Sequence, residues 1–186
     1  MSSTNKRLGI YGATGSYDFG DYAMLINNIQ DLFALEKNLT IVVFTPNVIC
    51  TQKILEANLD ENIISKIDVV YDGSNIFKSF WLRKILRICR KASFDLENMF
   101  FQYVWRKSLN GNSGIVNFLL PQRLNDAIQS IDILLFNGGG YLQNGWGNYN
   151  IYFAHIINLA YLYKKKIFFM ANSIGPLNEQ YRYIFG

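Results

Sequence analysis

Three short apolar runs in this sequence each lead directly into a segment that contains glycine. The runs cover residues 8–11, 131–136 and 166–171, and the segments after them cover 12–21, 137–145 and 172–176. Apolar runs of this length that end at turn residues are typical of buried β-strands. The carboxyl ends of parallel strands share one edge of a sheet, and ligands bind at that edge in open α/β folds. We therefore expect the three glycine-containing segments to be loops that meet at one ligand-binding edge.

Strand-like and helix-like patterns alternate along most of the chain. Strands are expected at 8–11, 39–44, 67–71, 131–136 and 166–171, and helices at 21–35, 50–58, 121–129 and 149–163. Such alternation predicts a parallel sheet whose strands are connected by helices. The expected fold class is therefore α/β, with a Rossmann-like open parallel sheet and helices on both faces.

Composition limits the number of domains and the kinds of partner. Hydrophobic residues make up 50% of the 186 residues and charged residues only 17%, which favours one folded domain over residues 1–186. The formal net charge of +4 suits an anionic small ligand or an anionic membrane surface and does not favour nucleic acid. The two cysteines, Cys50 and Cys89, have neither C-x-x-C spacing nor the number that a disulfide framework needs. We expect no metal site.

The sequence predicts neither export nor a membrane-spanning helix. The polar N-terminus lacks the apolar stretch of a signal peptide, so the expected compartment is the cytoplasm. The longest apolar stretch, 151–163, is shorter than the roughly 18 residues that a spanning helix needs. We expect it to be a helix of the core.

Residues 75–115 interrupt the alternation and are expected to form a helical insertion with a flexible loop. Within 77–91, apolar and aromatic side chains share one half of a helical wheel, and Arg and Lys side chains share the other. Such a helix suits peripheral contact with an anionic membrane, where lipid-linked sugars reside. An ordinary surface helix packed on the core explains the same pattern. A second helix is expected at 96–107 and the loop at 108–114.

The glycine-containing segments suit a ligand that is held by backbone amides. Glycine lets a ligand approach the backbone closely, and a helix N-terminus after such a segment favours a phosphate or carboxylate. Three successive glycines after a buried strand favour ligand approach over a simple turn. Asp21 either caps the helix that follows the first segment, or acts on a substrate as a hydrogen-bonding group or a base. Gln143 and Asn144 follow the triple glycine and are placed to bind sugar hydroxyls.

The first glycine segment resembles the opening of the short-chain dehydrogenases. Gly12-Ala13-Thr14-Gly15 follows a strand, and Tyr161 and Lys165 have the Tyr-x-x-x-Lys spacing of that family. This resemblance implies a domain that binds NAD(P). The sequence departs from the family at Asp18, where a third glycine is expected, and after Lys165, where a strand follows at once instead of more helix.

A second resemblance uses all three segments and extends along nearly the whole chain. Asp18-Phe19-Gly20-Asp21 resembles the Asn-x-Gly-Asp opening of the polysaccharide pyruvyltransferase family. Residues 132–140, DILLFNGGG, resemble its strand and triple-glycine loop, and Ser173-Ile174-Gly175-Pro176 resembles its Ser-Ile-Gly-Pro segment. The order and the approximate spacing agree. Asp18 departs from the family, which usually has Asn there, so a hydrogen-bonding role carried over to Asp18 is weakened.

The pyruvyltransferase resemblance implies an enzyme that moves a pyruvyl group from phosphoenolpyruvate onto two hydroxyls of a sugar, as a cyclic ketal in a surface polysaccharide. Such enzymes resemble GT-B-like, two-domain transferases, so residues 1–186 correspond to the N-terminal half and are expected to need a C-terminal domain for activity. The implied co-substrate is phosphoenolpyruvate, with no cofactor and no metal, and the implied acceptor is a glycan or lipid-linked sugar. The implied catalytic residue is Asp21, and the implied substrate-binding residues are Asp18, Gly20, Asn137, Gly138, Gly139, Gly140, Gln143, Asn144, Ser173 and Gly175.

A non-catalytic module that binds a glycan or an anion is the alternative from another functional class. It would keep the glycine segments without the partner domain. The pyruvyltransferase hypothesis predicts phosphate release from phosphoenolpyruvate, and the dehydrogenase hypothesis predicts binding of NADH or NADPH. A binding module predicts neither.

Overall fold

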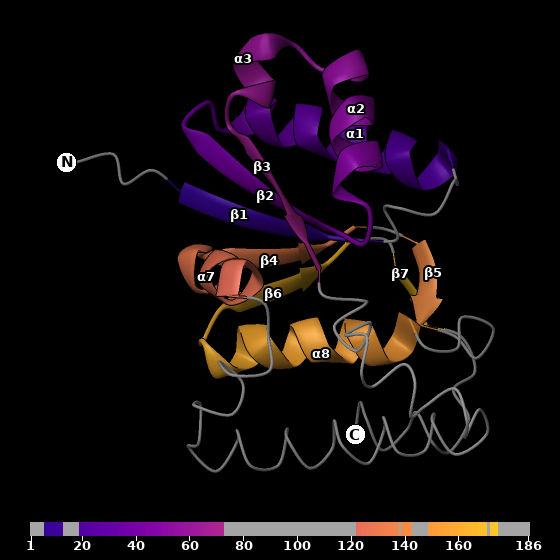
Figure 1. Ribbon diagram of the computed structural model, residues 1–186, viewed down its shortest axis with the longest axis vertical. Helices are drawn as coiled ribbons and strands as arrows, with labels where there is room; N and C mark the ends of the chain where they lie inside the picture. The colour runs from indigo at the N-terminus through magenta and orange to yellow at the C-terminus, as the bar shows by residue number, and fades with distance from the viewer. Residues whose placement is uncertain are drawn as a thin grey trace.

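A parallel five-stranded sheet forms the centre of the structure. The structure is a computed structural model, and it describes residues 6–12, 19–72, 122–137, 139–142, 149–170 and 172–174. The strand order is β3-β2-β1-β4-β6, and every neighbouring pair is parallel (Figure 1). The strands are β1 (Lys6–Tyr11), β2 (Leu39–Thr45), β3 (Ile67–Tyr71), β4 (Ile133–Phe136) and β6 (Lys166–Phe169). The expected parallel α/β sheet is confirmed.

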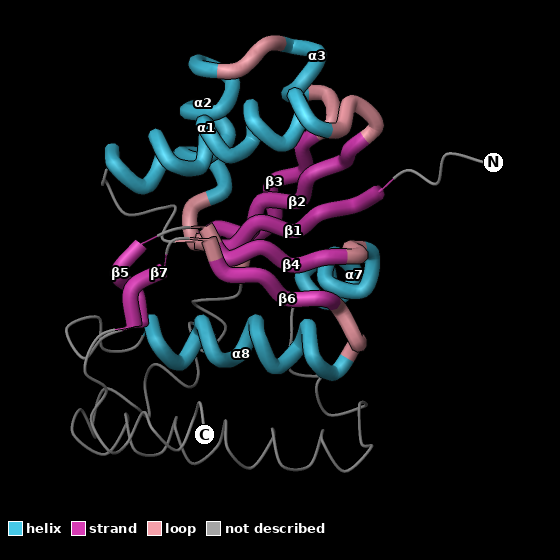
Figure 2. The backbone as a smooth tube through the Cα atoms, turned by 180° about the vertical axis from the view of Figure 1, so that it is seen from behind, coloured by secondary structure: helices cyan, strands magenta, loops and turns pink. Residues whose placement is uncertain are grey.

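Helices cover both faces of this sheet, as the sequence predicts (Figures 1 and 2). Helices α1 (Phe19–Leu35) and α2 (Val48–Asn58) pack on one face, and α7 (Gln122–Ser130) and α8 (Tyr149–Leu162) pack on the other. The short helix α3 (Glu61–Ile64), which the sequence pattern did not predict, connects α2 to β3.

The central strands are buried on both faces because their apolar side chains alternate between the two helical layers. In β2, Ile41 and Val43 belong to the hydrophobic cluster beneath α1 and α2, whereas Val42 and Phe44 belong to the cluster beneath α7 and α8. All four side chains are fully buried. A continuous apolar run such as 41–44 is the pattern expected for a parallel strand covered on both sides.

The connectivity of the sheet defines a topological switch point between β1 and β4. The chain runs outward from β1 through β2 to β3, and then resumes on the other side of β1 with β4 and β6. Both β2 and β4 therefore pair directly with β1. In open α/β sheets, ligands bind outside the carboxyl ends of the strands at this reversal.

Two short strands form a second, separate sheet beyond the carboxyl ends of β4 and β6 (Figures 1 and 2). Strand β5 (Gly139–Leu142) pairs in parallel with β7 (Asn172–Ile174), with Gly139 opposite Asn172 and Leu142 opposite Ile174. The expectation that these residues form open loops is therefore wrong. Glycine and short polar segments disfavour strands locally, so only the pairing of two distant segments makes them strands.

Strand β6 lies at the edge of the sheet, and the expectation that it is a buried strand is wrong. Phe168 is 53% exposed and Phe169 is 50% exposed, although the ring of Phe169 stacks on Phe136 with centroids 4.8 Å apart. Within the described residues β6 pairs only with β4. Its place in the strand order, rather than its apolar composition, determines its exposure.

The expected insertion at 75–115, including the cationic helix at 77–91, lies outside the residues that the structure describes. Membrane contact through 77–91 thus stays a prediction. None of the helices in the described part of the chain combines the length and the apolar character that crossing a membrane would require.

Candidate functional site at the switch point

The ends of β1 and β4 bring Gly12 and Asn137 together at the switch point. Tyr11 is opposite Phe136 in the β1–β4 register, so the residues that follow them are also neighbours. The backbone N–H of Asn137 donates to the carbonyl of Tyr11 at 2.7 Å, which continues the ladder by one residue. Asn137 is one of the predicted substrate-binding residues.

The side chain of Asn137 is buried, and its amide nitrogen is unpaired within the part of the chain that the structure describes. Its relative exposure is 0%, and its Oδ1 accepts a hydrogen bond of 2.5 Å from the Nδ2 of Asn28 in α1. Among the described residues, its own Nδ2 has no hydrogen-bond partner. A buried donor without an acceptor costs about 1–3 kcal/mol, and such groups are rare in folded proteins. An oxygen atom of a ligand would remove this cost.

Gly12 provides the space that the Asn137 side chain occupies. A Cβ atom at position 12 would lie 2.7 Å from the Cβ of Asn137 and 3.4 Å from its Nδ2. Because real Cβ contacts are longer than the first of these distances, a larger residue would displace the amide. The sequence suggested that glycine in this segment admits a ligand to the backbone, whereas the structure shows that Gly12 admits a neighbouring side chain.

A chain of buried hydroxyl groups holds the first turns of α1 against β2 and α2. The hydroxyl of Tyr22 lies 3.2 Å from the Oγ1 of Thr51, which lies 2.8 Å from the Oγ1 of Thr45 at the end of β2. The N–H of Asn47 donates to the same Thr45 oxygen at 3.2 Å, and the Asn47 side chain caps α2 by accepting from the N–H of Cys50. This network fixes the part of α1 that carries Gly20 and Asp21.

Asp21, the predicted catalytic residue, lies within the first turn of α1 and does not precede the helix. The helix begins at Phe19, so the interpretation of Asp21 as an N-cap is wrong. Asp21 is only 7% exposed and makes contacts. A carboxylate in the first helical turn is stabilised by the helix dipole. Figures 1 and 2 show that these first turns extend beyond the carboxyl ends of the strands.

The distance between Asp21 and the amide pair follows from helix geometry. Asn28 follows Asp21 by seven positions, which places the two residues about 10 Å apart along α1. Asn28 in turn contacts Asn137. Through this contact, the stretch of α1 that begins near Asp21 is linked to the residue that follows β4.

The other predicted site residues fall into two groups. Gly20 lies in the first turn of α1, and Gly139, Gly140 and Ser173 belong to the β5–β7 pair beyond the carboxyl edge. The second and third glycine segments are therefore brought side by side, at the edge to which α1 also extends. The remaining predicted residues lie outside the described part of the chain: Asp18, Gly138, Gln143, Asn144 and Gly175.

Asp132, the acidic residue at the start of the DILLFNGGG segment, lies at the opposite edge of the sheet. Its Oδ2 accepts from the backbone N–H of Arg7 at 2.9 Å, and its own N–H donates to the Arg7 carbonyl at 2.7 Å. These two bonds set the register of β4 against the beginning of β1. Asp132 thus stabilises the pairing of β1 and β4 at the amino edge. Asn137 is the polar side chain of this segment at the carboxyl edge.

The Tyr-x-x-x-Lys pair lies far from the glycine segment that a dehydrogenase would need. Tyr161 is near the end of α8 and is 67% exposed, and Lys165 directly precedes β6. The Nζ of Lys165 donates to the carbonyl of Gln129 at 2.6 Å. Both residues are therefore at the amino edge, whereas Gly12 is at the carboxyl edge where dinucleotides bind. This placement disfavours the dehydrogenase hypothesis.

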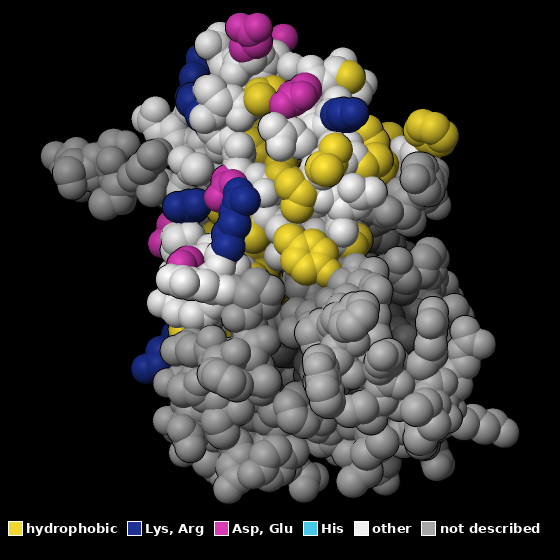
Figure 3. Space-filling model, in the orientation of Figure 1, with side chains coloured by type: hydrophobic (Ala, Val, Ile, Leu, Met, Phe, Trp, Pro, Cys, Tyr) yellow, Lys and Arg dark blue, Asp and Glu magenta, His cyan; other side chains and the backbone are white. Residues whose placement is uncertain are grey.

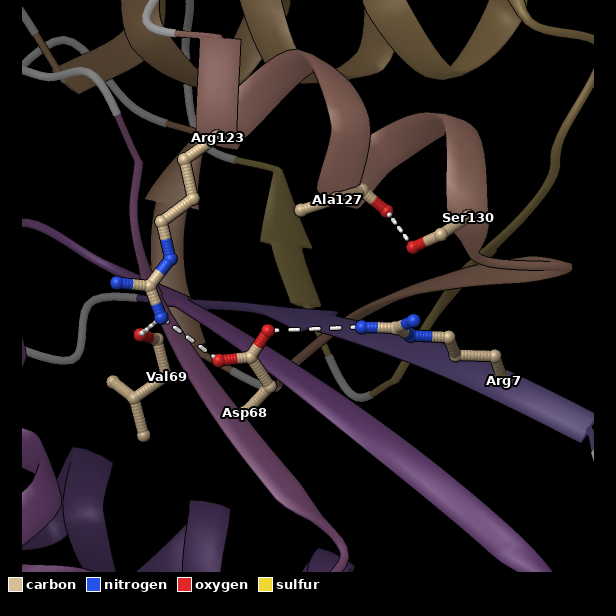
Figure 4. A network of polar contacts seen from close by, with 6 residues as sticks. All are labelled: Arg7, Asp68, Val69, Arg123, Ala127 and Ser130. Carbon is tan, nitrogen blue, oxygen red and sulfur yellow. Dashed lines mark hydrogen bonds and ion pairs between the residues drawn. The ribbon is translucent and has the colours of Figure 1, made fainter.

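A cluster of charged side chains also lies at the amino edge (Figure 4). Asp68 of β3 lies between two guanidinium groups, 3.0 Å from Arg123 of α7 and 3.6 Å from Arg7 of β1. Arg123 also donates to the carbonyl of Val69 at 3.3 Å.

The cluster borders a surface hollow of about 560 Å³ that Asp126 lines as well. In Figure 3 basic and acidic side chains lie next to one another above α7. With two Arg and two Asp the hollow has no net charge, so we interpret the cluster as a tie between α7 and the sheet.

Replacing Asp68 with asparagine is expected to lower the free energy of unfolding by about 1 kcal/mol, because partly exposed ion pairs are weak. The loss should nearly vanish in about 1 M NaCl, where charges are screened within a few ångströms. Urea denaturation at low and high salt measures both effects. Asp126→Asn is the control, since Asp126 lines the same hollow and makes no ion pair among the described residues. An equal, salt-independent loss in both variants would contradict this account of Asp68.

Comparison with protein-family models, with curated proteins and with solved structures gave no significant match. In the described part of the chain, no group of three His, Cys, Asp or Glu side chains could hold a metal ion. The residues at the switch point and the motifs in the sequence therefore carry the functional signal of this chain.

Proposed function

We propose that this chain is a Rossmann-like domain of a polysaccharide pyruvyltransferase, which transfers a pyruvyl group from phosphoenolpyruvate to two sugar hydroxyls as a cyclic ketal. The observation that carries the proposal is the buried amide of Asn137 beside Gly12 at the switch point, whose Nδ2 has no acceptor among the described residues. Asn137 belongs to segment 132–140, which resembles the strand and triple-glycine loop of that family. A phosphoenolpyruvate site requires hydrogen-bond donors that can bind its anionic oxygen atoms.

The reaction requires donors for an anion, an acid and a base. Protonation of the CH2 carbon of phosphoenolpyruvate makes a methyl group and leaves positive character on the carbon that bears the phosphate. One sugar hydroxyl adds to that carbon, and the second displaces hydrogen phosphate, so two C–O bonds to the sugar form and the C–O bond to phosphate breaks. One of the two hydroxyl protons balances the new methyl hydrogen, and the other leaves on the phosphate.

The described residues suit two of these tasks. The Nδ2 of Asn137 donates to the carboxylate or phosphate of the donor substrate, in a buried position where hydrogen bonds are strong. Asp21, in the first turn of α1, accepts a proton from an acceptor hydroxyl. In a GT-B-like arrangement a second domain would supply the remaining groups.

The proposal is tested by measuring phosphate release from phosphoenolpyruvate in the presence of candidate glycan acceptors, with the ketal product identified by mass spectrometry. The assay uses the longest protein product that contains residues 1–186. Phosphate release that depends on the acceptor would support the proposal. Binding of glycan or anion without release would favour the non-catalytic module, and saturable binding of NADH would favour the dehydrogenase. Activity from residues 1–186 alone would contradict the two-domain part of the proposal.

A further inference from the structure

The pairing of Asn28 with Asn137 determines which atom of the Asn137 amide faces a ligand. An amide side chain carries an acceptor oxygen and a donor nitrogen on two branches. Asn28 donates through its Nδ2 to the Oδ1 of Asn137 at 2.5 Å, so the oxygen is already used. The nitrogen is left on the Gly12 side without an acceptor among the described residues. Rotation of the amide by half a turn would exchange these positions.

We infer that Asn28 is a positioning residue that keeps the amide donor of Asn137 turned toward the switch point, where it binds an anionic oxygen of a carboxylate or phosphate group. The inference rests on the proposed function, because phosphoenolpyruvate carries both groups. Asn28 does not contact the ligand. It acts through Asn137, from a position two turns into α1.

The orientation of the amide matters because its two branches have opposite effects on an anion. A donor N–H binds an anionic oxygen strongly in a buried position, whereas an amide oxygen in the same place repels it. Asn137 is fully buried, so a ligand reaches its amide only when the groups that cover it move. Binding of the anion is therefore coupled to a local rearrangement, which the new hydrogen bond stabilises.

The decisive variants are Asn28→Asp and Asn28→Leu. Both remove the donor at position 28, and only aspartate replaces it with an acceptor. The Nδ2 of Asn137 then donates to the introduced carboxylate, and the Oδ1 turns toward the switch point. We expect Asn28→Asp to weaken binding of phosphoenolpyruvate by about 10- to 100-fold, as loss of a hydrogen bond to a charged group predicts. Asn28→Leu should weaken it less, because it removes the orientation without reversing it.

Isothermal titration calorimetry with phosphoenolpyruvate measures these affinities, and inorganic phosphate and pyruvate as separate probes identify which anionic group Asn137 binds. A probe whose affinity falls in Asn28→Asp is the group recognised. Affinities for all three probes that equal those of the native chain, in either variant, would overturn the inference. Asn28→Leu keeps this test decisive if the aspartate variant does not fold.

A second measurement reports the orientation without any ligand. The side-chain ¹⁵N–¹H signals of Asn137, identified by their absence from an Asn137→Leu variant, should move in Asn28→Asp as the Nδ2 gains a carboxylate acceptor. Acidification toward the ordinary aspartate pKa of about 3.9 should reverse the movement, because a protonated carboxyl can again donate to Oδ1. Unmoved signals would overturn the positioning role. Failure of the native chain to bind any probe would count against the proposed function, while this comparison still decides the role of Asn28.

Discussion

Replacing Asp21 with asparagine is expected to lower the turnover of the proposed pyruvyl transfer by about 10²- to 10⁴-fold, the usual contribution of a general acid or base. Asparagine keeps the size of the side chain and removes its ability to accept a proton. The affinity for phosphoenolpyruvate should change little, because the proposed anion donor is Asn137, which contacts α1 at Asn28, about 10 Å along the helix from Asp21. The measurement is acceptor-dependent phosphate release, with binding followed by calorimetry.

Asp31→Asn is the matched control, since Asp31 lies on the exposed side of the same helix. It removes one negative charge from α1 without touching the proposed site. Asp21→Asn should also lower the free energy of unfolding, by about 0.3–1 kcal/mol through the lost interaction with the helix dipole and further through the contacts of this buried side chain. If Asp21→Asn loses stability but keeps its turnover, Asp21 is a structural residue of the helix start, and another group must act as the base.

The strands of the main sheet could be predicted because each is a short apolar run bounded by turn residues. The prediction for β3, 67–71, agrees with its observed bounds, Ile67–Tyr71. By contrast, β5 and β7 escaped prediction because segments 139–142 and 172–174 become strands only through pairing with each other. The partial exposure of β6 could not be predicted either, because it follows from the position of β6 at the edge of the sheet, and strand order is a property of the whole sheet.

The candidate site was predictable only where a residue follows a strand. Asn137 was identified because it directly follows the apolar run 131–136. Gly12, its neighbour across the switch point, directly follows β1 in the same way. Nothing in the sequence indicated Asn28, because an asparagine in a helix is ordinary and its partner lies 109 positions away. The role of Asp132 could not be predicted because Asp132 and Asn137 belong to the same motif. They lie at opposite ends of β4, so only Asn137 is at the carboxyl edge.

A methyl group added at Gly9, in the middle of β1, is expected to lower the free energy of unfolding by about 1–3 kcal/mol. The added Cβ would lie 2.6 Å from the Cδ1 of Ile131, 2.9 Å from the Cε2 of Phe44 and 3.2 Å from the Cδ1 of Leu134. These three side chains are fully buried beneath α7 and α8, so none can move into solvent. Thermal unfolding of Gly9→Ala should show a decrease in Tm of about 2–4 °C per kcal/mol for a chain of this size.

A double-mutant cycle with Ile131→Val isolates the contact that causes this loss. Valine lacks the Cδ1 atom that lies closest to the added methyl group, and Ile131→Val alone should cost about 0.5–1.5 kcal/mol. If the clash is the cause, the combined variant should be more stable than the sum of the two losses predicts, by about 1 kcal/mol. The space that Gly9 leaves is then filled by Ile131, which directly precedes Asp132 and β4. Additive losses would instead attribute the effect to Phe44 or Leu134, and a neutral Gly9→Ala would contradict the close packing of β1 against α7 and α8.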